Sequence, residues 1–166
     1  SLHKYDARSY HHADPHFGPD PEGDKAMIDG ETGDPSTWKW TAADKMFLDL
    51  VQKAHQRGIR VILDGVFNHC ATSFFAFADL KKNQANSPYT HWFHVHQFDD
   101  PKTPDRNEFD YAGWWGVKSM PEFSEVTDEK GRKNLDPQVK AYLFAITKRW
   151  MDPNGDGNPS DGVDGW

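Results

Sequence analysis

A helix that leads straight into a short apolar strand is the feature of this sequence that most constrains its fold. Apolar residues after Thr41 recur at helical spacing, Thr41 can cap the helix, and Gly58 stands where a helix-ending glycine belongs. The β-branched run 59–67 follows at once and predicts a buried strand. A second helix is predicted from Asp136, which a proline follows, and residues 162–166 look like a strand that is just starting.

The order helix, strand, long connection, helix, strand predicts parallel strands joined by crossover helices, and therefore an α/β fold. The connection from His69 to Leu135 greatly exceeds the usual length of about 2–6 residues. Barrel enzymes place substrate-binding structure in such insertions at the carboxyl ends of their strands. We therefore expect a partial TIM (β/α)8 barrel with a long excursion domain inserted after the strand. Residues 1–40, rich in turn formers, predict an irregular loop.

The acidic balance of the chain argues against nucleic acid as a partner. The formal net charge is −7, whereas phosphate binding needs a basic surface. No run of Lys or Arg and no basic amphipathic helix indicates a membrane partner. Cys70 is the only cysteine, which excludes an internal disulfide framework. No targeting segment can be read, so the localisation is unknown.

Aromatic residues are frequent, with seven Trp and eleven Phe. This composition fits a large aromatic core, and it also fits a cleft in which flat rings stack on sugars. Trp114 and Trp115, with Tyr111 nearby, could line such a cleft or pack inside the excursion domain. The sequence favours neither interpretation.

Four motifs follow one another along nearly the whole chain. They are 3–6 (His-Lys-Tyr-Asp) with 14–18 (Asp-Pro-His-Phe-Gly), 64–69 (Asp-Gly-Val-Phe-Asn-His), 120–123 (Met-Pro-Glu-Phe) and 161–166 (Asp-Gly-Val-Asp-Gly-Trp). In this order they resemble signature segments of glycoside hydrolase family 13, the α-amylase family, and especially its cyclomaltodextrinase, neopullulanase and maltogenic amylase branch. Phe123 and Ser124 depart from the Leu-Asn that usually ends the third motif.

The resemblance implies a division of the chain and an activity for its parent. Residues 1–68 would be barrel (the loop after strand 2, helix 2 and strand 3), 69–135 the inserted excursion domain, similar to domain B of the family, and 136–166 barrel again (helix 3 and the start of strand 4). The parent would hydrolyse α-1,4-glucosidic bonds of maltodextrin, cyclodextrin or starch with retention of configuration. It would need no organic cofactor, and it could be a homodimer.

Retaining glycosidases use a nucleophilic carboxylate and an acid/base carboxylate. The resemblance places both of these residues beyond Trp166. We therefore expect an internal fragment that is inactive by itself, and we assign no catalytic residue within it.

The substrate-binding residues that the resemblance implies are His69, Tyr5 and His3. His69 would donate to a sugar hydroxyl, and Tyr5 would stack beneath the sugar, with His3 a weaker candidate of the same kind. Asp64, expected to be buried, would orient an arginine, and Asn68 would fix the loop that leaves the strand. Without the motifs, His69 and Tyr5 would be interpreted as ordinary packing residues.

Two segments could bind metal ions. The first segment, residues 152–157, resembles the first half of a calcium-binding loop, although Val163 stands where such a loop has its twelfth-position Glu. A solvated acidic turn is an equally good interpretation of this segment. Its candidate ligands are Asp152, Asn154, Asp156 and Asp161. The second segment, residues 91–96, carries three histidines that could bind a zinc ion, but it offers no clear fourth ligand. Its histidines are His91, His94 and His96.

Three other kinds of protein remain open. A catalytically inactive amylase-like protein, serving in glucan binding or with a transporter, would keep the fold and lose a carboxylate outside this segment. A glucosyltransferase or an α-1,6-hydrolase of the same family would use the same half-barrel. An independent calcium-binding domain would fold stably as the isolated chain, whereas a fragment would be poorly soluble and partly folded.

Overall fold

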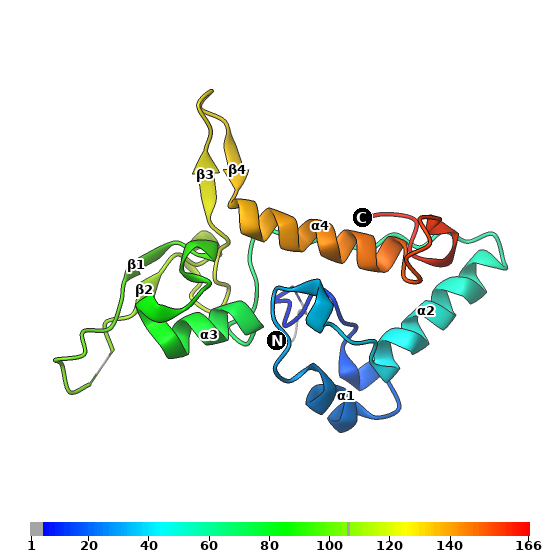
Figure 1. Ribbon diagram of the computed structural model, residues 1–166, viewed down its shortest axis with the longest axis horizontal. Helices are drawn as coiled ribbons and strands as arrows, with labels where there is room; N and C mark the ends of the chain where they lie inside the picture. The colour runs from blue at the N-terminus through cyan, green and yellow to red at the C-terminus, as the bar shows by residue number, and fades with distance from the viewer. Residues whose placement is uncertain (1–4, 106) are drawn as a thin grey trace. The chain divides into compact units, whose positions relative to one another are not determined.

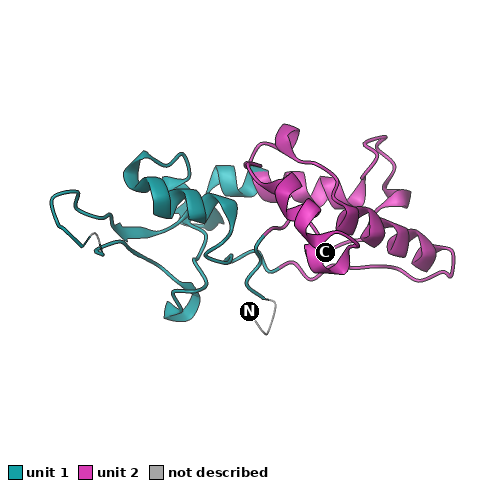
Figure 2. Cartoon of the chain, turned by 90° about the horizontal axis from the view of Figure 1, so that it is seen from below, with its two compact units in different colours: residues 1–8, 66–141 teal, residues 9–65, 142–166 magenta. Residues whose placement is uncertain are grey.

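The computed structural model describes residues 5–105 and 107–166 (Figure 1). They form two compact units (Figure 2): unit 1 takes in the described residues of 1–8 and 66–141, and unit 2 comprises 9–65 and 142–166. The division into two units does not test the predicted domain boundaries, so an excursion domain at 69–135 remains a prediction. Within the described ranges, no helix has both the length and the apolar character needed to cross a membrane.

The helix predicted after Thr41 is confirmed as α2 (Ala42–His55). The Thr41 hydroxyl accepts a hydrogen bond from the Asp44 amide, and the Asp44 carboxylate accepts one from the Thr41 amide. Gly58 closes the turn after the helix with φ 70°, and its amide donates to the carbonyl oxygen of His55 at 2.8 Å. Both ends of α2 therefore follow from local sequence signals.

A further helix, α1 (Pro21–Ile28), lies where the sequence predicts only an irregular loop. Asp20 caps its start by accepting from the Gly23 amide at 2.9 Å. On α1, the buried Asp24 accepts from the amides of Ala42 and Ala43 at 2.7 and 2.9 Å. The first turn of α2 is thus capped by a side chain of α1 as well as by its own residues.

The predicted buried strand at 59–67 is wrong in its burial and its extent. This segment makes one isolated parallel bridge, between Ile62 and Gly165, flanked by hydrogen bonds from Leu63 and to Val61. Ile62 is 68% exposed. A parallel strand is buried when other elements cover both faces and pair with both edges, and one short partner does not do this. The parallel direction of the pairing agrees with the prediction.

The second predicted helix is confirmed as α4 (Pro137–Met151). Asp136 accepts a hydrogen bond from the Gln138 amide at 2.8 Å, as a capping residue does. The apolar side chains at helical spacing are all buried. They are Val139, Tyr142, Leu143, Ile146 and Trp150.

Unit 1 combines α3 (Phe75–Asn83) with two small antiparallel sheets (Figure 1). One sheet pairs β1 (Val95–Gln97) with β2 (Asp110–Tyr111), and the other pairs β3 (Glu125–Thr127) with β4 (Lys133–Leu135). Its core is largely aromatic, so part of the aromatic content serves packing. The most deeply buried rings are Phe74, Phe77, Trp92, Phe93 and Phe123.

Short 3₁₀ helices complete both units and position several of the residues discussed below. They are η1 (Pro15–Phe17), η2 (Pro35–Thr37), η3 (Gln84–Asn86), η4 (Thr90–Trp92), η5 (Trp114–Gly116) and η6 (Pro159–Asp161).

Candidate functional site

His69 is the most deeply buried of the predicted substrate-binding residues that the structure describes, with 1% of its surface exposed. Asn68 Nδ2 lies 2.8 Å from His69 Nδ1, and His69 Nε2 lies 2.9 Å from the carbonyl oxygen of Tyr5. Because an amide nitrogen only donates, Nδ1 accepts, and Nε2 carries the proton that is donated to Tyr5. Asn68 therefore fixes the tautomer of His69.

Backbone pairing joins the segment that carries His69 to the motif at 120–123. His69 forms an antiparallel bridge with Glu122, the Cys70 amide donates to Pro121, and the Phe123 amide donates to Asn68. Two motifs that lie far apart in the sequence are therefore side by side in unit 1.

Three rings stack in a row beside this paired segment. The ring centroids of His69 and Trp114 are 4.9 Å apart with planes 19° apart, and those of Trp114 and Trp115 are 4.3 Å apart at 12°. Trp115 is 85% exposed, so the row runs from a buried histidine to a solvent-facing tryptophan. A flat exposed ring of this kind is a suitable surface for stacking against the apolar face of a sugar.

The conformation of Trp115 is strained. Its φ of 52° lies in the left-handed region, which costs a residue with a Cβ about 1–2 kcal/mol, and Gly116 follows at φ 80°. Tyr111 does not join the row. Its ring packs against Phe77 at 4.6 Å, and its hydroxyl donates to the carbonyl of Lys118 at 2.8 Å.

The remaining predicted site residues are placed unevenly. Tyr5 is 55% exposed, and its backbone carbonyl holds His69. Asp64 is exposed in unit 2, so the expectation that it is buried is wrong, because its extended segment has one short partner in the structure. His3 lies outside the described residues. The functional roles of His69, Tyr5, His3, Asp64 and Asn68 remain predictions.

The calcium-like loop shows a mixed picture. Buried oxygens of two of its acids, Asp152 Oδ1 and Asp161 Oδ1, have no hydrogen-bond partner. In contrast, Asn154 accepts from the Asp156 amide at 2.8 Å, and Asp156 accepts from the Asn158 amide at 2.7 Å. The loop therefore offers two unsatisfied acid oxygens, while its other two candidate ligands fold the turn itself.

The histidine-rich segment does not gather as a zinc site would require. His94 Nε2 accepts from the Glu125 amide at 3.2 Å, and His96 Nδ1 lies 2.9 Å from Asp110. Among residues 5–105 and 107–166, the one group of three His, Cys, Asp or Glu side chains whose ligand atoms all lie within 4.8 Å of one another is a different group. It consists of His11, His12 and Glu31, which we did not predict.

Comparison with known families gives one match over most of the chain. The profile described as "Alpha amylase, catalytic domain" matches residues 40–165. Neopullulanase 2 of Thermoactinomyces vulgaris is 33% identical over 166 residues, which cover 100% of this chain and 21% of that protein. A cyclomaltodextrinase of Geobacillus thermopakistaniensis is 34% identical over 151 residues, 91% of this chain and 20% of that protein. The chain thus spans about a fifth of the length of these curated relatives.

Solved structures agree with the sequence comparison. The Nostoc punctiforme debranching enzyme in an acarbose-soaked crystal superposes with a TM-score of 0.61 and 31% identity, covering 100% of this chain and 27% of that chain. A Thermus thermophilus protein, Ttha1563, superposes with a TM-score of 0.60 at 31% identity, covering 100% and 26%.

Proposed function

Because this chain belongs to the α-amylase catalytic-domain family, we propose that its parent is a glycoside hydrolase that cleaves α-1,4-glucosidic bonds of maltodextrin, cyclodextrin or starch with retention of configuration. The names of the relatives, among them a cyclomaltodextrinase and an intracellular maltogenic amylase of Bacillus subtilis, support an α-glucan substrate. The family expected from the motifs is thereby confirmed, and the likeness to barrel enzymes of this family is consistent with a partial (β/α)8 barrel.

The single observation that carries this proposal is the arrangement around His69. A family motif residue is buried, tautomerically fixed by Asn68 and stacked on Trp114, next to the paired motif at 120–123. Such support from neighbouring groups is what a substrate-binding side chain needs in order to hold its orientation.

In the proposed function, His69 donates from Nε2 to a hydroxyl of the bound glucose unit. The same proton is donated to the Tyr5 carbonyl in the structure, so the sugar would take the place of that carbonyl or share the donor with it. A hydrogen bond to the sugar that strengthens as the ring flattens lowers the barrier to forming the oxocarbenium-like transition state. The ring of Tyr5 and the exposed face of Trp115 would supply stacking surfaces.

The finer assignment of the chain is also a proposal. Residues 69–135 would be the excursion domain inserted after the third barrel strand, which is supported by the backbone pairing that joins its beginning to 120–123. The nucleophilic Asp and the acid/base Glu would lie outside residues 1–166, so the segment alone would not hydrolyse glucans.

A calcium ion at the loop 152–161 belongs to the same proposal. Two buried acid oxygens without partners would be satisfied by a hard cation that prefers oxygen ligands, with water completing its coordination.

The proposal is tested with the full-length protein that contains this chain. We expect it to hydrolyse maltoheptaose, β-cyclodextrin and soluble starch, with the initial product in the α-anomeric form when it is observed by NMR. A His69→Leu variant, which removes the Nε2 donor, should fold and hydrolyse glucans far more slowly than the wild type, while the isolated segment should show no hydrolysis. Glucan binding without any hydrolysis by the full-length protein would contradict the proposal and favour an inactive, glucan-binding relative.

A further inference from the structure

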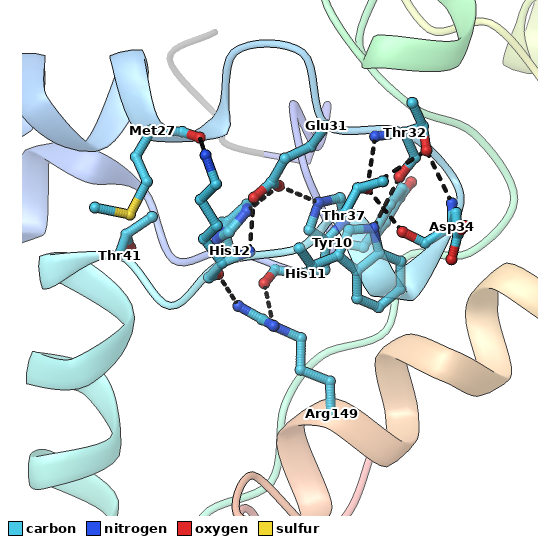
Figure 3. A network of polar contacts seen from close by, with 12 residues as sticks. Tyr10, His11, His12, Met27, Glu31, Thr32, Asp34, Thr37, Thr41 and Arg149 are labelled. Atoms are coloured by element: carbon cyan, nitrogen blue, oxygen red, sulfur yellow. Dashed lines mark hydrogen bonds and ion pairs between the residues drawn. The ribbon is translucent and has the colours of Figure 1, made fainter.

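Two adjacent histidines in unit 2 point at the same oxygen atom (Figure 3). His11 Nε2 lies 3.0 Å and His12 Nε2 lies 2.6 Å from Glu31 Oε2. The three residues are 2%, 8% and 9% exposed. Two imidazole nitrogens and one carboxylate oxygen therefore converge in a place from which water is largely excluded.

Each of these three side chains is held from its far side by another group. His12 Nδ1 lies 2.7 Å from Asp44 Oδ2, and His11 Nδ1 lies 2.8 Å from the Tyr142 hydroxyl. Glu31 Oε1 accepts from the Lys39 amide at 2.7 Å. Metal-binding histidines characteristically use their second ring nitrogen in this way, with a carboxylate, carbonyl or hydroxyl that orients the ring.

Arg149 braces the backbone that carries the ligand atoms. Its Nε donates to the carbonyl oxygen of His11 at 2.8 Å, and its Nη2 donates to that of Lys39. It also lies 3.3 Å from Asp44, and its positive charge acts on both Asp44 and Glu31.

Glu31 and Asp44 place two negative charges beside His12 and Arg149 supplies one positive charge, so one further positive charge at the ring of His12 would balance them. Each of its ring nitrogens faces a carboxylate, and an ionised carboxylate only accepts. Without a metal, the ring would have to donate from both nitrogens, which places a buried imidazolium between two acids. A metal ion at Nε2 supplies the positive charge and leaves Nδ1–H to donate to Asp44.

We propose that His11, His12 and Glu31 form a binding site for a divalent transition-metal ion, with Zn²⁺ the best match. Two nitrogens and one oxygen suit zinc, whereas calcium prefers oxygen ligands alone. Tetrahedral bonds of about 2.1 Å separate ligand atoms by about 3.4 Å, so Glu31 would retreat by less than about 1 Å from its place between the rings. Water would take the fourth position.

Binding is balanced by the release of protons. The metal takes the Nε2 lone pairs of both histidines, and any proton on these atoms leaves to solvent. His11 then carries its proton on Nδ1 and donates it to the Tyr142 oxygen. The ion would join Glu31 to His11 and His12, whose other ring nitrogens contact α2 at Asp44 and α4 at Tyr142. This role is structural and does not depend on the proposed hydrolase activity.

The test measures zinc in the full-length protein, prepared without a histidine tag. After loading with Zn²⁺ and gel filtration, metal analysis should find one equivalent more in the wild type than in Glu31→Gln. Wild-type protein loaded with Co²⁺ should show visible absorption, which the same variant loses. His16→Ala is the matched control, since this neighbouring histidine is exposed and pairs with Asp14, outside the cluster, and this variant should bind zinc as the wild type does.

A second variant guards against failure of Glu31→Gln to fold. Tyr142→Phe removes only the outer hydroxyl and should weaken zinc binding by about 10–100-fold while the protein stays folded. Equal zinc content in the wild type, Glu31→Gln and Tyr142→Phe, or a chelator-treated protein whose melting temperature zinc does not raise, would overturn the proposal. In that case hydrogen bonds among His11, His12 and Glu31, without a metal ion, hold the cluster together.

Discussion

The ring of His69 lies nearly flat against the ring of Trp114, and Trp114 in turn stacks on the exposed Trp115. These aromatic contacts connect a buried polar residue from a family motif to the surface. The position of His69 depends on Asn68 on one side and on this indole on the other.

Trp115 should contribute to glucan binding without contributing to stability. Replacing it with Gly removes the stacking face and relieves the left-handed φ, so the free energy of unfolding should stay the same or rise by about 1 kcal/mol. Loss of stacking should raise the KM for maltodextrins about 2–10-fold. Phe144→Ala, which also removes an exposed ring, is the control and should leave the KM unchanged. An unaltered KM in Trp115→Gly would remove Trp115 from the site.

Gly162 and Gly165 form a matched pair for a test of close packing. A Cβ on Gly162 would come within 2.3 Å of the Trp150 carbonyl oxygen and 2.4 Å of that of Met151, whereas a Cβ on Gly165 would meet nothing within 4 Å. Gly162→Ala should therefore lower the melting temperature by several degrees, because backbone atoms cannot yield as side chains do. Gly165→Ala should melt close to the wild type. Equal melting of the two variants would show that this turn does not approach α4 as described.

Cys70 should resist alkylation in the folded protein. Burial raises the pKa of its thiol well above the ordinary value, and the thiolate is the reactive form. Iodoacetamide at pH 8 should label this cysteine only after denaturant is added, as read by mass spectrometry of the peptide that contains it. Rapid labelling in native conditions would indicate that unit 1 opens easily.

The carboxylate of Asp110 should titrate at unusually low pH. Hydrogen bonds from Lys118 and then from His96 hold its pKa at about 2, against an ordinary value of 3.8. Because the folded pKa is the lower one, the ion pair stabilises β2 above about pH 4, and this contribution is lost as the pH falls toward 2. NMR titration should show a higher pKa in Lys118→Gln, and an unchanged value would mean that the pair does not persist in solution.

Calcium should raise the melting temperature of the full-length protein by an amount that depends on Asp161. Asp161→Asn should reduce this increase, since it weakens one of the two acids with a buried unpaired oxygen. Asp156→Asn keeps the oxygen that accepts from the Asn158 amide, so this variant should retain most of the calcium-dependent increase in melting temperature. An identical response of both variants would exclude the loop as the site.

The predictable parts of the fold are those specified by neighbouring residues. The reciprocal cap of Thr41 and Asp44 and the apolar spacing of α4 lie within one helix, so they can be read from the sequence. The burial expected for 59–67 depends on which elements cover it, and the sequence of a strand does not contain that information. We did not predict α1, because Gly23 and the turn formers around it favour a loop. Asp20 as the capping residue and Pro21 at the first helical position were the signals for this helix.

The candidate site was predictable only where a motif names it. Only the motif around His69 marks it as a site residue, because a single histidine is otherwise interpreted as a packing residue. The structure gives it two polar partners and a stacking ring. The cluster of His11, His12 and Glu31 has no comparable motif, and Glu31 lies in a segment without periodicity. The pair of adjacent histidines was the one available signal, and it does not indicate which acid will face them.

The pairing of 68–70 with 121–123 has a consequence for how this protein can diversify. Because the backbone closes on itself at this point, residues 71–120 form a cassette whose two ends are already fixed together. Lengthening, shortening or exchanging the cassette would leave its anchoring points in place, and the entropic cost of a longer closed loop grows only slowly with its length. New substrate preferences could therefore be acquired by grafting within the cassette, with no redesign of the scaffold that presents it.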